Sequence, residues 1–174
     1  MSQNLLDNGL TIEEENCLIA LLAKINPKMM GTRLFDAIAR KTVSVAIEAV
    51  CLRMFHDGIR VYLIERSLND TAYCGQWHCP GSVMRSGEDV KDVFERLVKR
   101  EFGSSINSWK FVANVNHTDE ERGHFFSLVY LCDLDLELER RGKWFSINNL
   151  PDNIVLFHKE KVIPIAVGAF LEEN

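Results

Sequence analysis

The chain lacks several features that would each place it in a class. No apolar run has membrane-spanning length and the polar first eight residues do not resemble a signal peptide, so we expect a cytoplasmic protein that does not enter a membrane. No internal repeat or low-complexity linker divides the 174 residues, a length that suits one domain with a sizeable core. A net charge of -5 without a basic stripe argues against nucleic-acid binding.

Cysteine is sparse, and its spacing is not that of a zinc or redox motif. The five cysteines are an odd number with no pair separated by two residues. Three lie in apolar runs, so we expect buried free thiols in a reducing compartment. Cys74, His78 and Cys79 are close in sequence, but without a second ligand pair loop packing is favoured over zinc.

Local patterns predict helices at both ends of the chain and strands between them. A capping box at residues 11–14 opens a helix to about residue 24, which Asn26-Pro27 breaks, and a second helix covers 32–39. We expect the first helix to pack its apolar face on its own domain, while a homodimer contact stays open. That face contains Leu18, Ile19, Leu21, Leu22 and Ile25.

Residues 42–53 and 59–66 predict a first hairpin around a turn at 55–58. Residues 111–116 and 124–133 predict a second hairpin around a polar loop, and a helical segment follows residue 150, where Pro164 can kink it. Strands flanked by helices predict an α/β fold, an α/β/α sandwich around a mixed sheet.

The most informative stretch runs from residue 80 to residue 103 and predicts an amphipathic helix. Ser86 stands at the N-cap position, acidic Glu88 and Asp89 suit the first turn, and Gly103 ends the segment as a C-cap does. Five apolar residues recur at helical spacing and form one stripe: Val90, Val93, Phe94, Leu97 and Val98. By periodicity alone, this is a core-packing helix with a solvated charged face.

The same stretch resembles the Nudix box, whose pattern is Gly, five residues, Glu, seven residues, then Arg-Glu-aliphatic-any-Glu-Glu-any-Gly. Glu88, Arg96, Glu101 and Gly103 stand in that frame, and residues 75–81 resemble the G-x-W-x-x-P-G-G segment that precedes the box. The resemblance implies a Nudix-like domain over residues 41–174, preceded by an N-terminal helical extension over residues 1–40.

The chain departs from the box at three positions, where Ser82 replaces a glycine and Leu97 and Arg100 replace glutamates. Of the three carboxylates on the metal-facing part of the helix, Glu101 is retained. Because Mg2+ prefers several hard oxygen ligands, Glu101 with a carbonyl from the Gly81–Ser82 loop is expected to hold one Mg2+ or Mn2+ ion rather than several. Arg100 weakens cation binding and favours an anionic phosphate.

One branch of the superfamily, the Nudix-like GDP-mannose glycosyl hydrolases, departs from the box in a similar way. Residues 95–97 and 101–103 resemble its Arg-Leu start and its lone glutamate before an aliphatic residue and glycine. The resemblance implies a single Mg2+ and cleavage at the sugar carbon. That branch begins its box Gly-Gly-Arg, whereas here the residues are Gly81-Ser82-Val83, and its catalytic histidine has no evident match.

Three arginines are candidates for contact with substrate phosphates. Arg66 ends the second predicted strand, where the family often has a basic residue near the substrate, although a solvated strand end is equally compatible. Arg100 neighbours Glu101. Arg96 can contact phosphate, but in the box it more often braces the loop or a carboxylate, which is the role we favour.

The candidates for a general base lie later in the chain. Relatives supply a metal ligand or base from the region of Glu137 and Glu139, although a solvent-facing pair is the commoner reading. His117 and His124 flank the acidic loop and suit a base or phosphate contact near neutral pH, but isolated histidines at strand ends are usually structural. We rank Glu101 above them, followed by Glu139 and His124.

Two functions follow from these residues. The first is a single-metal hydrolase of a nucleoside diphosphate linked to another group, such as a sugar, acting on a small nucleotide-type substrate. The second is a Nudix-fold protein that has lost efficient hydrolysis and binds a ligand or a partner. Glu101 favours the first function, while Leu97 and Arg100 favour the second.

Overall fold

The computed structural model describes residues 5–103, 105–134 and 142–173. Its contacts divide the chain into two compact units, Met1–Gly31 and Thr32–Asn174. The domain boundary that the family resemblance implies, at residue 41, stays a prediction.

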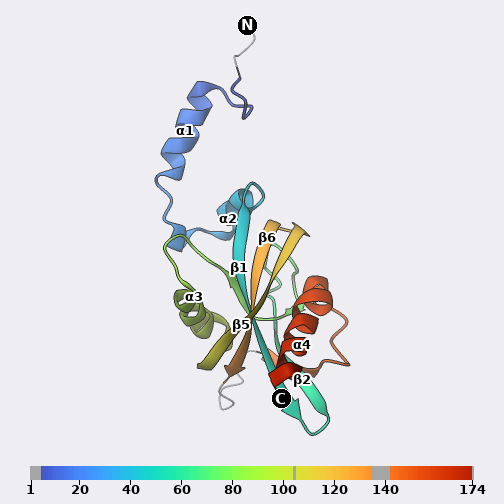
Figure 1. Ribbon diagram of the computed structural model, residues 1–174. Helices are drawn as coiled ribbons and strands as arrows, with labels where there is room; N and C mark the ends of the chain where they lie inside the picture. Colours follow the sequence, from blue (N-terminus) through green and yellow to red (C-terminus); the bar gives the residue numbers. More distant parts are fainter. Residues whose placement is uncertain (1–4, 104, 135–141, 174) are drawn as a thin grey trace. The chain divides into compact units, whose positions relative to one another are not determined.

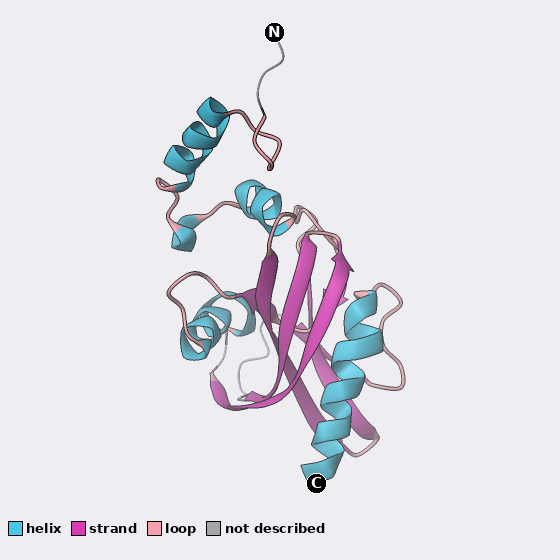
Figure 2. Ribbon diagram, turned by 45° about the horizontal axis from the view of Figure 1, so that its top comes forward, coloured by secondary structure: helices cyan, strands magenta, loops and turns pink. Residues whose placement is uncertain are grey.

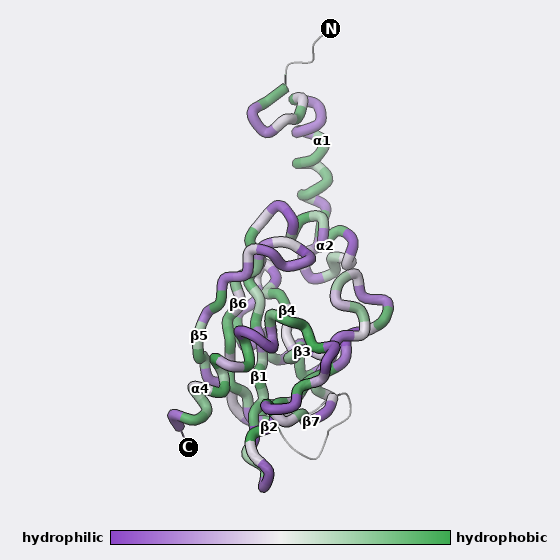
Figure 3. The backbone as a smooth tube through the Cα atoms, turned by 90° about the vertical axis from the view of Figure 1, so that its right-hand side faces the viewer, coloured by the Kyte–Doolittle hydropathy of each residue, from purple (hydrophilic) through white to green (hydrophobic). Residues whose placement is uncertain are grey.

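The first unit contains helix α1 (Ile12–Leu22) and the short helix η1 (Pro27–Met29). The predicted capping box is present, because Thr11 Oγ1 accepts the Glu14 N–H at 3.3 Å and Glu14 Oε2 accepts the Thr11 N–H at 2.8 Å. No residue of α1 is buried within its own unit, and the packing of its apolar face on the rest of the chain or on a second copy stays a prediction. Figure 3, which is coloured by hydropathy, shows that α1 is largely hydrophobic.

The second unit opens with α2 (Thr32–Ala39), as predicted, and is built on seven strands. These are β1 (Val43–Phe55), β2 (Gly58–Glu65), β3 (Trp77–His78), β4 (Gly81–Val83), β5 (Ile106–Glu120), β6 (Gly123–Leu134) and β7 (Gly142–Ser146). The strand order in the sheet is β3-β2-β1-β6-β5, and in addition β4 pairs with β1 and β7 pairs with β2. Because β1 and β6 run parallel and the other pairs antiparallel, the sheet is mixed (Figure 1).

Helices cover the sheet from both sides (Figure 2). On one side lie α3 (Val90–Leu97) and the π-helical turn η2 (Val98–Phe102), and on the other lie η4 (His158–Val162) and α4 (Ile163–Glu173). A hydrophobic core lies on each face of the sheet, and alternate residues of β1 point into one or the other. Ile47 packs in the core that contains Phe94 of α3, and Val50 packs in the core that contains Val162 of η4. The predicted α/β/α sandwich around a mixed sheet is therefore confirmed.

Helix α3 begins later than the sequence predicts. Asp89 is the N-cap rather than Ser86: Asp89 Oδ1 accepts the Asp92 N–H at 2.9 Å, and Asp92 Oδ2 accepts the Asp89 N–H at 3.0 Å. Ser86 cannot be the N-cap because the next residue, Gly87, has a φ of +80°, which is not a helical conformation, and turns the chain. Gly103 ends the helical segment in the left-handed conformation, with a φ of +63°, as predicted.

Both predicted hairpins form, and the second is longer than expected. Strands β5 and β6 reach Glu120 and Gly123, so its turn is tighter than the predicted six-residue loop. All five cysteines are free: Cys51, Cys79 and Cys132 are buried, and Cys17 and Cys74 are exposed. Within the described ranges, no helix is long and apolar enough to cross a membrane.

Candidate functional site

Gly81 lies between two carboxylates and leaves no room for a side chain. It pairs with Glu48 across β1 and β4, and its N–H donates to Glu101 Oε2 at 3.2 Å. A Cβ at this position would stand 2.6 Å from Glu48 Oε2 and 2.9 Å from the Ile47 carbonyl oxygen. Glycine is therefore required here, and it brings a strand glutamate and a helix glutamate to one backbone residue.

Glu48 is a functional candidate that the sequence analysis missed. It is 8% exposed, in the middle of the apolar strand β1, and Ser127 Oγ donates to its Oε1 at 3.2 Å. Burial raises the pKa of Glu48 to about 8; the Ser127 hydrogen bond opposes this rise, and the charge of Glu101 adds to it. The available signal was a single carboxylate in the middle of a largely apolar strand.

Glu101 lies in the π-helical turn that extends α3. Burial raises the pKa of its carboxyl to about 7, while the Gly81 N–H and the charges of Arg66, Arg96 and Arg100 act in the opposite direction. Buried Glu48 and half-buried Glu101, two carboxyls with a pKa near neutrality that repel each other when ionised, form the centre of the candidate site.

His158 joins Glu48 to the segment that leads to Gly81. Its Nδ1 accepts the Cys79 N–H at 2.9 Å, so the ring proton is on Nε2, which lies 3.7 Å from Glu48 Oε2. Burial lowers the pKa of His158 to about 3, so the ring is neutral. Burial also lowers the pKa of His78, whose ring centroid lies 6.0 Å from that of His158. No local pattern around residue 158 marks it, because its partners are distant in sequence.

Arg66 is a cation whose charge acts on all three groups of this centre. It follows β2, its charge acts on Glu48, Glu101 and His158, and its Nη2 donates to Asp70 Oδ2 at 2.8 Å. The structure therefore brings the strand-end arginine, a predicted substrate contact, into the surroundings of Glu101.

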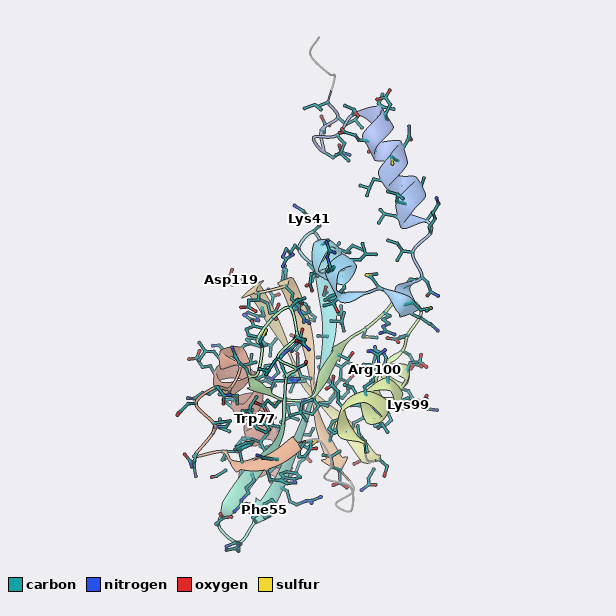
Figure 4. The ribbon with its side chains drawn as sticks, turned by 180° about the vertical axis from the view of Figure 1, so that it is seen from behind. Lys41, Phe55, Trp77, Lys99, Arg100 and Asp119 are labelled. Atoms are coloured by element: carbon teal, nitrogen blue, oxygen red, sulfur yellow. The ribbon has the colours of Figure 1, made fainter. Side chains whose placement is uncertain are left out.

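Arg96 braces the loop before α3. Its Nε donates to Glu88 Oε1 at 3.1 Å and its Nη2 to the Val83 carbonyl at 2.9 Å, while Nη1 contacts Ser82 Oγ. These contacts match the bracing role that we favoured, and they engage the Ser82 hydroxyl. Arg100 is exposed on η2, where Figure 4 labels it beside Lys99, and its charge acts on Glu101.

The remaining candidates lie elsewhere or outside the described residues. His124 Nε2 lies 2.6 Å from Asn116 Oδ1 near the tip of the β5–β6 hairpin. His117 stacks on Phe157 with ring centroids 3.9 Å apart, and burial lowers its pKa. Glu137 and Glu139 fall in the segment 135–141, outside the residues that the structure describes.

The donor set suits one hard cation. Among residues 5–103, 105–134 and 142–173, no three His, Cys, Asp or Glu side chains gather as a metal site. Glu48 and Glu101 flank Gly81, and Mg2+ commonly takes one or two carboxylates and completes its shell with water and substrate phosphates. Leu97 adds no ligand, because it is packed in the core at 1% exposure.

Comparison with known proteins identifies the family. The NUDIX domain model matches residues 45–164, and the chain belongs to this family. No protein of curated function matches it in sequence.

Solved structures share the fold at low identity. The NUDIX domain of Shewanella oneidensis NrtR, complexed with ADP ribose, is 15% identical with a TM-score of 0.57, over 90% of this chain and 98% of that one. An ADP-ribose pyrophosphatase from Streptococcus suis is 22% identical with a TM-score of 0.57, over 76% and 96%. A longer NrtR structure from Shewanella oneidensis, 15% identical with a TM-score of 0.61 over 75% of this chain, is matched over 64% of its own length.

Proposed function

We propose that the protein is a Nudix-type hydrolase of a nucleoside diphosphate linked to another moiety, such as a sugar, and that it uses a single Mg2+ or Mn2+ ion. The observation that carries this proposal is the pair of buried Glu48 and half-buried Glu101 on either side of Gly81. Paired carboxylates with a pKa near neutrality suit cation binding and proton transfer at working pH.

Each residue of the site has a role in this proposal. Glu101 and the Gly81–Ser82 loop hold the cation, which when bound neutralises charge on the phosphates. Glu48, with a pKa of about 8, exchanges a proton near neutral pH and suits general acid–base work. Arg66 binds the phosphates, and Arg96 keeps the loop in place through Glu88 and Ser82.

A specific observation supports a second candidate function, which is ligand binding without efficient hydrolysis. Leu97 occupies a glutamate position of the family signature, and as the last residue of α3 it packs into the core, so it cannot serve the site. The NrtR NUDIX domain, which has the same fold, was solved as a complex with ADP ribose. A ligand sensor would use Arg66, Glu48 and Glu101 to recognise the ligand and would release it unchanged.

The test is a screen of nucleoside diphosphate sugars, dinucleotides and nucleoside triphosphates with Mg2+ and Mn2+, reporting phosphate and reducing-sugar release separately. Glu101→Gln keeps the shape and removes the charge, so it should lower turnover by on the order of 100-fold or more. Glu95→Gln makes the same change at an exposed position of α3 and should leave turnover unchanged.

Equal turnover by the Glu101→Gln variant and the parent would exclude Glu101 from the site. Tight binding of one compound class without turnover would instead favour the second function.

A further inference from the structure

Four charged side chains of alternating sign connect helix α2 to the candidate site. They are Asp36 of α2, Arg122 of the β5–β6 turn, Asp70 of the β2–β3 loop and Arg66 at the end of β2. We refer to them as the ion-pair chain. None of the four side chains is more than 23% exposed, so water screens their charges less than it screens those of surface pairs.

Asp70 is shared between two arginines. Its Oδ2 accepts from Arg66 Nη2 at 2.8 Å, and its Oδ1 accepts from Arg122 Nη2. Arg122 Nη2 also contacts Thr71 Oγ1 at 3.2 Å, and Arg122 Nε lies 3.5 Å from Asp36 Oδ1. One carboxylate therefore serves two guanidinium groups, one of which faces the site.

Backbone packing holds the three segments together. A Cβ at Gly123, beside the β5–β6 turn, would stand 2.4 Å from the Ala39 carbonyl oxygen at the end of α2. In the β2–β3 loop, Tyr73 has a φ of +56° and its N–H donates to Glu121 Oε2 at 3.0 Å. Figure 1 shows α2 beside the same end of the sheet as the β5–β6 turn. The ion-pair chain therefore joins rigidly placed segments.

We propose that Arg122 and Asp36 are positioning residues that set how tightly Arg66 binds the phosphates of a nucleoside-diphosphate ligand, by dividing the Asp70 carboxylate between the two arginines. The inference rests on the proposed function in one respect, the placing of ligand phosphates beside Arg66. A phosphate and Asp70 compete for the same guanidinium, so any change that draws Asp70 toward Arg122 frees Arg66.

Substitutions at Arg122 and at Asp36 should give effects of opposite sign. Arg122→Met leaves Asp70 to Arg66 alone, so affinity for the anion should fall by about fivefold, the scale of one partly buried ion pair. Asp36→Asn takes a carboxylate from Arg122, which then draws Asp70 more strongly, so affinity should rise by about threefold. General loss of structure cannot produce an increase.

The experiment measures the dissociation constants of ADP-ribose and inorganic pyrophosphate by titration calorimetry with the full chain. Arg122→Lys keeps the charge and should recover affinity relative to Arg122→Met. Arg40→Met and Asp119→Asn make matched charge changes at exposed positions near the end of α2 and near the β5–β6 turn, and should alter affinity less than about twofold. Weakening by both Arg122→Met and Asp36→Asn, or equal effects from the exposed controls, would overturn the proposal.

A second readout separates this inference from the proposed function. If the parent binds neither probe, the proposed ligand class is wrong. The ion-pair chain can then be tested without a ligand, by measuring the rate of guanidinium rotation of Arg66 through the NMR signal of its Nε–H. Arg122→Met should slow that rotation and Asp36→Asn should speed it. Unchanged rotation in both variants would show that Asp70 is not divided between the two arginines.

Discussion

At the scale of single residues, Gly81 decides how close the two carboxylates can come. Strand β4 brings its backbone against β1, and the missing side chain leaves the space that Glu48 Oε2 occupies. The N–H of the same residue meets Glu101. The distance between Glu48 and Glu101 therefore depends on position 81 having no side chain.

Gly81→Ala should destabilise the protein, because the new Cβ would stand 2.6 Å from the carboxylate oxygen of Glu48 and 2.9 Å from the backbone oxygen of Ile47. The expected loss is about 1–3 kcal/mol, the usual cost of overpacking. Gly168→Ala is the matched control: it has open space in α4 and should stabilise the helix by about 0.5–1 kcal/mol. Urea unfolding measures both, and a neutral Gly81→Ala would contradict the close approach.

Residue-level prediction from sequence succeeded where partners are local. Glu101 and Gly103 belong to one helical segment, so the apolar periodicity predicted the helix and its end at Gly103, and the family resemblance singled out Glu101 within it. Glu48 and His158 were missed because their partners, Ser127 and Cys79, each lie 79 residues away along the chain. Burial and pairing over such separations follow from the sheet topology, which a linear pattern does not contain.

At the scale of elements, the helix after Gly81 widens just where Glu101 stands. Residues Val98–Phe102 form a π-helical turn, a geometry that is rare and often found at functional sites. The apolar spacing predicted the helix and its buried stripe, but not this widening, because i, i+3 and i+4 patterns assume a regular helix. Val90 and Val98, at the edges of the stripe, are only half-buried.

Restoring the family signature with Leu97→Glu and Arg100→Glu tests whether this element has lost a function or been adapted. Leu97 is 1% exposed, so the double variant should lose about 2–5 kcal/mol of stability without metal. Mg2+ or Mn2+ should offset part of that loss by binding the folded state. Thermal unfolding with and without metal measures this, and Arg100→Glu alone separates the exposed change from the buried one.

If function was lost, the double variant should gain metal affinity and pyrophosphatase activity. If the site is adapted to one metal, the variant should lose whatever activity the parent has. A folded variant that binds no more metal than the parent, with unchanged activity, would show that this helix end is not the cation site.

At the scale of the whole molecule, the carboxyls of Glu48 and Glu101 make the free energy of unfolding depend on pH. The pKa of Glu48 is about 8 and that of Glu101 about 7 in the folded protein, against 4.5 for an ordinary glutamate side chain. The folded state therefore holds more protons than the unfolded state above about pH 4.5, and stability falls as pH rises toward 8. His158, with a pKa of about 3, acts in the opposite sense, and its contribution is complete above pH 6.5.

Between pH 6.5 and 8, the free energy of unfolding should therefore decrease, by at most about 1.4 kcal/mol per pH unit for each carboxyl involved. Glu48→Gln should remove much of this slope, and saturating Mg2+ should flatten it by stabilising the ionised pair. Chemical denaturation at several pH values measures the slope. A parent whose stability is constant from pH 6.5 to 8 would show that the two carboxyls are not protonated in the folded state.

The distance along the chain between Glu48 and the groups that bury it has a consequence for biosynthesis. The first hairpin can form as soon as residue 65 has been made, but Ser127 belongs to β6 and His158 to the closing helical segment. Until those segments arrive, Glu48 is solvated and ionised at neutral pH. Proton uptake by Glu48 should therefore accompany the packing of Ser127 and His158 against it, and until then the nascent chain keeps an ionised carboxylate of β1 in water.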